Sequence, residues 1–225
     1  MDEHRSVTVA PIAHIETDFP QKFGVPRQAG LVPELEGRVV FEPDYRIPDT
    51  VRGLEGFSHV WLLWLFSQSP TEWSPTVRPP RLGGNQRMGV FATRSPVRPN
   101  RLGLSCVRLL RVDDGPQLVV AGADLVDGTP ILDVKPYVPA DRVEDPRRGW
   151  LDALEQRGLD VEIPDDLAAR IPDERLSALR GVLAQDPRPA YQRDQREYGV
   201  AFAGRNVRFT VDGNLLRVID VTRLE

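Results

Sequence analysis

Five polar segments rich in glycine and proline carry most of the side chains that could do chemistry. They are residues 26–28, 78–85, 94–100, 124–130 and 133–137. Their arginines can bind a carboxylate or phosphate through two parallel hydrogen bonds, and their carboxylates can accept hydrogen bonds from hydroxyl or ammonium groups. The sequence has no GxxxxGK(S/T) loop, no GxGxxG after a strand and no GxSxG. A nucleotide-like ligand would therefore be held in neither a P-loop nor a Rossmann manner.

The positive charge of the chain is concentrated in one segment. Arginine supplies all but two of the 29 basic residues, and residues 73–112, which we call the arginine block, hold eight arginines and no acidic residue. The whole chain nevertheless has a formal net charge of −4. A positive block in an acidic protein indicates a polyanionic partner such as phosphate or nucleic acid. The alternative is that these arginines pair with acidic side chains from other parts of the fold.

The composition disfavours metal and disulfide chemistry. The single cysteine, Cys106, excludes an internal disulfide and a cysteine-rich zinc site. The three histidines show neither HxxH nor HExxH spacing, so we expect no metal. No run approaches the ~18 apolar residues that cross a bilayer, and residues 1–20 lack a basic start followed by an apolar run. We therefore expect a cytoplasmic protein that does not bind membranes.

Short apolar runs must position the polar segments. In the first 140 residues these runs are 7–15, 38–41, 60–66, 88–92, 104–112, 118–123 and 131–134. Their lengths and spacing favour an antiparallel barrel or sandwich. Run 60–66 is apolar on both faces, which predicts a central strand covered on both sides, with its aromatic rings in the core or at a subunit interface more readily than at a ligand. Prolines and glycines in 75–85 exclude a helix and indicate an exposed loop.

The last third of the chain has a different pattern. Proline followed by acidic residues at 164–166 and 172–174 predicts two helix starts. Alternating apolar residues at 198–202 and 207–211, followed by a turn and the run 215–221, predict a hairpin. The expected fold class is therefore mainly β: a small β-barrel domain of residues 1–145, followed by a small α+β domain of residues 146–225.

The polar segments, taken in order, form one recognisable set. The elements are FGVPRQ at 23–28, VRGLEGFSHVW at 51–61, RPPRLGGN at 78–85, MGVFATRSPVRPNRLGLS at 88–105 and DLVDGTPILDVKPYVP at 124–139. They resemble the TsaA-like (TrmO) family of S-adenosylmethionine-dependent tRNA methyltransferases, and AQDPRPAY at 184–191 resembles the tail domain of its bacterial members.

This resemblance implies a fold, an assembly and a reaction. The implied fold is a small β-barrel, and the implied assembly is a homodimer with S-adenosylmethionine bound near the subunit interface. The reaction would methylate the exocyclic N6 of threonylcarbamoyladenosine, beside the anticodon of threonine-accepting tRNA. The tail domain would aid tRNA binding.

The resemblance also implies which residues contact the cofactor. The matching positions are Pro26, Arg27, Gln28, Ser67, Gln68, Arg94, Leu104, Asp124, Leu125, Val126 and Asp127. The family often has histidine where this chain has Ser67. Carboxylates can accept hydrogen bonds from the ribose hydroxyls or the ammonium group of adenosylmethionine, and an arginine can bind its carboxylate. The leucine and valine side chains can cover the adenine ring.

Methyl transfer requires mainly that donor and acceptor be placed in line. Because the acceptor nitrogen's lone pair is delocalised into the purine and the attached urea, a base that takes its proton would help. Asp127, Lys135 and Tyr137 are the nearest candidates by motif, and the sequence does not choose among them. His59, at the edge of the apolar run, is expected to be a structural histidine bonded to the backbone.

The tRNA contacts are expected in the arginine block. Arg78, Arg81 and Arg98 are assigned to RNA phosphates because they lie in proline- and glycine-rich loops without acidic neighbours. Two alternatives remain, a non-catalytic RNA-binding barrel and a methyltransferase of a small molecule. The intact PRQ and DGTP elements argue against the first, and the arginine block and tail domain argue against the second.

Overall fold

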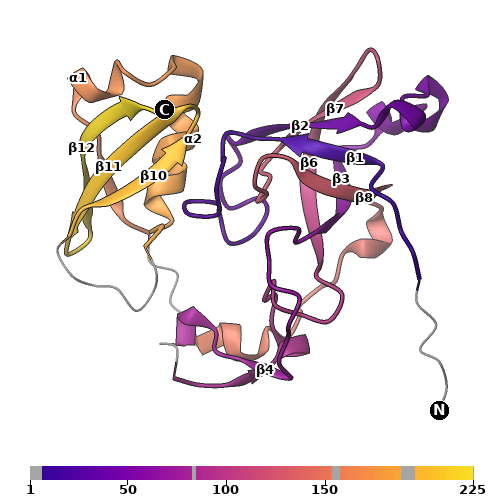
Figure 1. Ribbon diagram of the computed structural model, residues 1–225, viewed down its shortest axis with the longest axis horizontal. Helices are drawn as coiled ribbons and strands as arrows, with labels where there is room; N and C mark the ends of the chain where they lie inside the picture. The colour runs from indigo at the N-terminus through magenta and orange to yellow at the C-terminus, as the bar shows by residue number, and fades with distance from the viewer. Residues whose placement is uncertain (1–6, 83–84, 154–157, 189–195, 225) are drawn as a thin grey trace.

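The computed structural model describes residues 7–82, 85–153, 158–188 and 196–224. Figure 1 shows a β-barrel next to a second unit at the C-terminal end, drawn in orange and yellow. The predicted fold class, a mainly β chain with a barrel followed by an α+β region, is confirmed.

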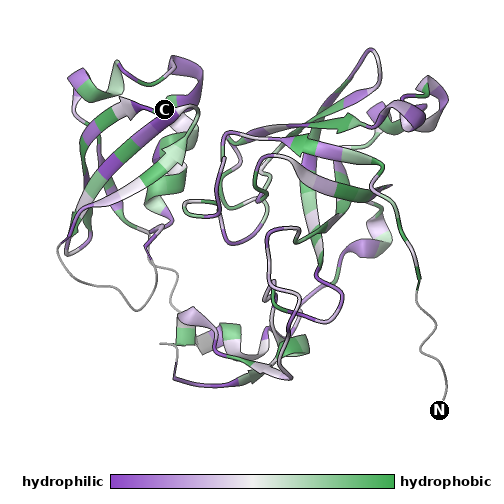
Figure 2. Cartoon of the chain, viewed as in Figure 1, coloured by the Kyte–Doolittle hydropathy of each residue, from purple (hydrophilic) through white to green (hydrophobic). Residues whose placement is uncertain are grey.

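Six antiparallel strands close the barrel. They are β1 (Ala13–Glu16), β2 (Glu36–Phe41), β3 (His59–Leu65), β6 (Leu102–Asp113), β7 (Gln117–Ala121) and β8 (Thr129–Pro136). Their order is β1-β2-β7-β6-β3-β8, and the closed ring leaves no free edge among them. Side chains alternate along the strands, so that Val60, Leu62 and Trp64 of β3 are buried inside. Figure 2 shows this alternation of apolar and polar residues along the barrel strands.

Strand β3 is central, as predicted, since it pairs with both β6 and β8. The prediction that both of its faces are covered is wrong for the single chain. Trp61, Leu63 and Leu65 point outward and are only half-buried, because in a barrel one face of every strand points away from the core. The indole Nε1 of Trp61 donates to Asp141 Oδ2 at 2.9 Å, which covers part of this outer face.

Two predicted strands are shorter than expected. Residues 7–12 are not in a strand, and β1 begins only at Ala13. Residues 90–92 form a 3-10 turn, η5 (Val90–Ala92), because the Thr93 N–H turns back to the Val90 carbonyl. Only β5 (Met88–Gly89) is extended, and it pairs with the two-residue strand β4 (Thr76–Val77).

Short 3-10 turns make up the remaining regular structure among residues 7–82 and 85–153. They are η1 (Pro43–Tyr45), η2 (Pro48–Val51), η3 (Leu54–Gly56), η4 (Pro80–Leu82), η6 (Pro139–Asp141) and η7 (Gly149–Ala153). The segment expected as an exposed loop, 75–85, thus contains β4 and η4, with Pro79 buried. No helix in the described ranges is long and apolar enough to span a membrane.

The C-terminal unit packs two helices against a four-stranded sheet. Its elements are β9 (Asp160–Glu162), α1 (Asp165–Ala168), α2 (Asp173–Ala184), β10 (Tyr198–Phe202), β11 (Arg205–Asp212) and β12 (Leu215–Arg223), with sheet order β10-β11-β12-β9. Both helices begin directly after the prolines that predicted them, Pro164 and Pro172. The hairpin β11–β12 was predicted, whereas the parallel strand β9 was not.

Each unit has its own core, but the two cores do not divide at one point of the sequence. The barrel core contains residues of all six barrel strands. The C-terminal core also contains Phe19, Val32 and Leu35, which come from the loop between β1 and β2. This loop therefore belongs to the barrel by chain position and to the C-terminal unit by packing.

Candidate functional site

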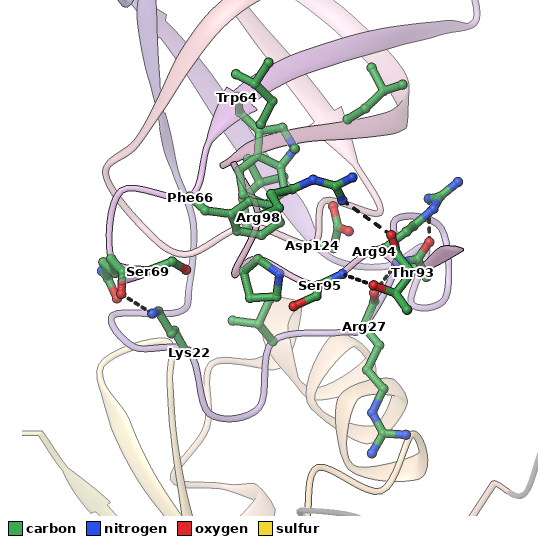
Figure 3. A pocket seen from close by; sticks show the side chains of 18 of the residues that line it. Lys22, Arg27, Trp64, Phe66, Ser69, Thr93, Arg94, Ser95, Arg98 and Asp124 are labelled. Atoms are coloured by element: carbon green, nitrogen blue, oxygen red, sulfur yellow. Dashed lines mark hydrogen bonds between the residues drawn. The ribbon is translucent and has the colours of Figure 1, made fainter. Parts of the chain in front are cut away.

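A cavity of about 1060 Å³ lies at the end of the barrel where β3 stops and β6 starts (Figure 3). Loops from the predicted polar segments surround it. Ten of the eleven predicted cofactor positions line this cavity: Pro26, Arg27, Gln28, Ser67, Gln68, Arg94, Leu104, Asp124, Leu125 and Val126. The structure thus brings together residues that lie up to 100 positions apart in the chain.

Two aromatic rings form one wall of the cavity. Trp64, the penultimate residue of β3, and Phe66 lie edge to face with ring centroids 4.2 Å apart. Gly103 on β6 faces Trp64, and a Cβ atom at this glycine would lie 2.2 Å from the indole ring. Only glycine therefore allows the indole to lie against β6. The wall offers flat apolar surface suited to a purine ring.

A hydrogen-bonded chain leads from this wall to the one carboxylate among the described lining residues. The Trp64 Nε1 donates to Ser105 Oγ at 3.0 Å, and Ser105 Oγ donates to Asp124 Oδ1 at 2.6 Å. Burial raises the pKa of Asp124, and hydrogen bonds from Ser105 and the backbone, with the charge of Arg94, partly oppose that rise. Asp124 is thus a fixed acceptor at the base of an apolar cavity, suited to hydroxyl or ammonium donors.

Cationic side chains tie the surrounding loops together. Arg94 Nη1 donates to Gln28 Oε1 at 2.5 Å, and Arg98 Nη1 donates to the Thr93 carbonyl at 3.4 Å. Lys22 Nζ donates to the Gln68 carbonyl. The cavity therefore combines apolar walls with positive charge at its rim, a combination that can hold an anionic group of a ligand.

Arg27 differs from the other lining arginines in its direction. Its Nη2 lies 3.4 Å from the Asp186 carbonyl and 3.5 Å from the Arg188 carbonyl, both in the C-terminal unit. Figure 3 shows its guanidinium extending away from Asp124, toward the faint orange ribbon of that unit. Arg27 thus contributes to the cavity through a side chain whose head is turned to the neighbouring unit.

The arginines assigned to RNA are not separated from the cavity. Arg78 and Arg98 both line it, alongside Arg94. The side chain of Arg81 lies outside the part that the structure describes. Among the described ion pairs, only Arg111 of the arginine block has an acidic partner, Asp113 at 2.8 Å. Local neutralisation, the alternative considered from the sequence, thus applies to little of the block.

The candidate bases are not brought to this cavity within the chain. Asp127 lies just beyond it, exposed, with its Oδ1 accepting the Thr17 N–H at 2.9 Å. Lys135 pairs with Asp133 at 2.9 Å on the outside of β8. Tyr137 packs against the His59 end of β3, with ring centroids 6.2 Å apart. The cavity is at the other end of that strand, roughly 20 Å away for a strand rising about 3.3 Å per residue.

His59 is not bonded to the backbone as predicted. Its Nδ1 lies 2.9 Å from the Ser58 hydroxyl, and its ring lies edge to face with that of Tyr137. No group of three or more potential metal-ligating side chains occurs within the described ranges.

Several cavity residues were not predicted from the sequence. Trp64 and Phe66 were expected in the core or at a subunit interface, yet both line the cavity, and Trp64 also belongs to the barrel core. Ser105, which is buried and supports the cavity through its hydrogen bond to Asp124 without lining it, was also missed, because nothing in the sequence joins the two residues. Trp150 of η7 reaches the cavity by donating from Nε1 to the Ala92 carbonyl at 2.9 Å. A glycine opposite an aromatic residue on the neighbouring strand was the one available signal for the Trp64 wall.

Comparison with known proteins gives matches over nearly the whole chain. The model of the tRNA-methyltransferase O N-terminal domain matches residues 14–141, and the model of the TrmO C-terminal domain matches residues 157–224. The tRNA (adenine(37)-N6)-methyltransferase of Escherichia coli K12 is 43% identical over 215 residues, covering 89% of this chain and 91% of the relative.

Two further matches come from Pseudomonas aeruginosa. A putative S-adenosylmethionine-dependent methyltransferase, RcsF, is 45% identical over 228 residues, covering 95% of this chain and 97% of that protein. The crystal structure of TrmO from this organism superposes with a TM-score of 0.82 at 38% identity, covering 99% of this chain and 100% of that one.

Proposed function

This chain belongs to the TrmO family of S-adenosylmethionine-dependent tRNA (adenine-N6)-methyltransferases, and we propose that its acceptor is threonylcarbamoyladenosine beside the anticodon of threonine tRNA. The names of its relatives give adenine 37 of tRNA as the methylated base. The threonylcarbamoyl group and the threonine tRNA are the part of the assignment that we add.

The composition of the cavity is the observation that supports this function. Its volume suits a ligand of nucleoside size. Phe66 and Leu104 offer apolar surface to an adenine ring, backed by the buried Trp64 and Leu125, while Asp124 is placed to accept hydrogen bonds from ribose hydroxyls or an ammonium group. Arg94 at the rim suits the methionyl carboxylate. When bound there, adenosylmethionine supplies a methyl group on a positively charged sulfur.

The chain's own contribution is chiefly placement. The hydrogen bonds Trp64–Ser105–Asp124 and Arg94–Gln28 fix groups from five separate segments around one cavity. Such fixed groups lower the barrier by holding the reactants in line and by excluding water. A base at the acceptor nitrogen would add to this, and Asp127, the candidate that lies nearest the cavity, remains our proposal for that role.

The other two candidate bases can act only if a second subunit brings them to the cavity. Lys135 and Tyr137 lie toward the far end of β3 and β8 in the same chain. We therefore retain them as part of a proposed homodimer. Exposed apolar side chains surround the cavity mouth: Phe91 is 77% exposed and Leu104 54% exposed. Apolar surface of this kind is commonly covered by a partner.

The arginine block supports tRNA as the partner. Arg78 and Arg98 line the cavity without an acidic partner among the described ion pairs, so they can meet RNA phosphates at its entrance. We include Arg81 in the same role because of its place in the sequence. We keep a cytoplasmic location as part of the proposal, on the sequence expectation alone.

The proposal is tested by mixing the purified chain with S-adenosylmethionine that carries a labelled methyl group. The tRNA is supplied in two forms, from cells able and unable to make the threonylcarbamoyl modification. We expect label in threonine tRNA from the first source only, recovered at N6 after digestion to nucleosides. Equal labelling of both forms would show that unmodified adenosine is the acceptor. Cofactor binding without labelling of any tRNA would favour the small-molecule alternative.

A further inference from the structure

The loop that carries the PRQ turn is anchored in the core of the C-terminal unit. Upstream of the turn, Phe19 packs against Phe202 of β10 with ring centroids 5.3 Å apart. Downstream, Val32 is buried beside Gly181 of α2, where a Cβ atom would lie only 2.6 Å from Val32 Cγ1. Both ends of the loop are therefore held by the same neighbouring unit.

Polar contacts reinforce this anchoring at Asp18. Its carboxylate Oδ2 lies 3.1 Å from Nε of Arg175 on α2, with side chains 16% and 29% exposed. The Asp18 carbonyl accepts the Ala203 N–H at 3.0 Å. Burial raises the pKa of Asp18, and the charge of Arg175 opposes this rise. This partly buried ion pair therefore joins the loop between β1 and β2 directly to α2.

The middle of the same loop enters the cavity. Gly24, with a φ of +95°, packs so closely on Val200 of β10 that a Cβ atom would lie 2.1 Å from its Cγ2. The residues that follow, Pro26 and Gln28, line the cavity, and the backbone N–H of Ala29 donates to the Asp124 carboxylate. A shift of the C-terminal unit against the barrel would therefore move cavity residues.

Charges on the C-terminal unit argue against its being mainly an RNA contact. Its described arginines are largely paired with acids: Arg170 and Arg208 with Asp220, and Arg217 with Glu162. Residues 151–225 also contain more acidic than basic residues. Phosphate binding requires unneutralised cations, and the structure places those in the arginine block.

We propose that the C-terminal unit acts on the cofactor site, by clamping the loop 18–35 in the conformation that forms the cavity, with Asp18 and Arg175 as positioning residues. This inference rests on the proposed binding of S-adenosylmethionine in the cavity. The clamp can change cofactor affinity only as far as it changes the free-energy difference between the closed and the loosened loop. A single ion pair should therefore change affinity by roughly three- to tenfold.

The test compares two substitutions in the full chain by calorimetry with S-adenosylmethionine. Arg175→Gln removes the ion pair of the clamp, and Arg217→Gln removes a more exposed ion pair, Arg217–Glu162 at 2.9 Å, elsewhere in the same unit. We expect Arg175→Gln to weaken cofactor binding three- to tenfold and leave the KM for tRNA unchanged, Arg175→Lys to restore part of the loss, and Arg217→Gln to bind normally. Unchanged affinity in Arg175→Gln, or equal loss in both variants, would overturn the clamp.

Two additions keep the outcome decisive. Asp18→Asn breaks the same ion pair with little change of volume, and it replaces Arg175→Gln if that variant does not fold. Because coupling is reciprocal, cofactor should also slow hydrogen exchange of the clamp amide Ala203 N–H, but not that of Asp160 N–H, which bonds within the unit. Equal exchange with and without cofactor would contradict the clamp. Failure of the unaltered chain to bind cofactor would instead remove the proposed cofactor site, and the clamp with it.

Discussion

The ionised form of Asp124 favours ligand binding but lowers the stability of the fold. Its carboxylate is buried beside apolar side chains, and burial raises its pKa. A raised pKa in the folded state means that folding favours the protonated form. The stabilisation is complete below the pKa of the unfolded chain, about 3.9 for aspartate, and is lost as the pH rises through the raised pKa. The charged form thus weakens the fold at neutral pH while providing the acceptor for a ligand.

Replacing this residue should therefore separate the two effects. Asp124→Asn should weaken S-adenosylmethionine binding by about 1–3 kcal/mol, the loss of a buried hydrogen bond to a charged group. Its Tm, measured relative to the unaltered chain, should rise as the pH goes from acid to neutral, because the ionisation cost is gone. Calorimetry and thermal unfolding between about pH 3 and pH 8 measure both. Asp133→Asn, at a half-exposed ion pair, is the control for affinity. An unchanged affinity in Asp124→Asn would remove Asp124 from the site.

Gly103 makes a second residue-scale prediction. A methyl group there would lie 2.2–2.5 Å from the Trp64 ring, so the ring must move out of the cavity wall. Gly103→Ala should destabilise the fold by about 1–3 kcal/mol, as overpacking does, and should also weaken cofactor binding. Gly56→Ala, where no atom lies within 4 Å of the added methyl, should have neither effect. Normal unfolding and affinity in Gly103→Ala would show that the indole is not fixed against β6.

The sequence predicted cavity residues that lie in segments resembling the family. It missed residues that reach the site only because two strands are neighbours in the barrel. Asp124 and Gln28 lie in segments whose order resembles the family, and both line the cavity. Ser105 reaches Asp124 only because β6 and β7 are neighbours in the barrel. Lys135 and Tyr137 lie in the same recognised segment as Asp124, but β8 carries them away from the cavity along the barrel wall.

At the scale of elements, short apolar runs predicted the barrel strands, and prolines followed by acidic residues predicted the helix starts. A strand was predicted wrongly where the backbone makes a hydrogen bond to a residue close in sequence instead of pairing with a neighbouring strand. Val90–Ala92 has the composition of a strand but closes a 3-10 turn onto Thr93. The sequence predicts a buried outer face of β3 because Trp61, Leu63 and Leu65 are apolar. In the barrel this face points away from the core and is half-exposed.

The arginine block makes the prediction at this scale. Arg78 lies on an exposed position next to the two-residue strand β4, at the cavity entrance. Arg78→Gln should lower the slope of log affinity for tRNA against log salt by about one unit, and it should weaken binding to all tRNAs alike. Arg52→Gln, which removes an exposed arginine already paired with Asp49, should change the slope little. Loss of cofactor affinity in Arg78→Gln, with the salt slope unchanged, would assign Arg78 to the cofactor instead.

At the scale of the whole molecule, the two units are less separate than their sequence patterns indicate. A division near residue 145 follows the change in composition and stays a prediction. The packing instead assigns Phe19, Val32 and Leu35 to the C-terminal core. Such long-range contacts carry no local signal, since nothing in the sequence of the loop indicates which unit its apolar residues pack against. The loop 18–35 therefore belongs to both units, because it lines the cavity and also packs into the C-terminal core.

At the scale of the whole molecule, we also predict that the chain forms a homodimer. The outer face of β3 and the cavity mouth together expose Leu63, Leu102 and Phe91 to different degrees, and burying such surface favours association. Light scattering at micromolar concentration should therefore give about twice the 25.3 kDa of one chain. Leu63→Glu, which introduces a charge on the outer face of β3, should shift the particle toward a single chain. Leu110→Glu, toward the opposite end of β6, should leave the dimer intact.

If dimerisation also brings Tyr137 of the partner subunit to the cavity, Leu63→Glu should lose methyl transfer at concentrations where it still binds cofactor. A single-chain mass for the unaltered protein would contradict the dimer and remove Lys135 and Tyr137 as candidate bases.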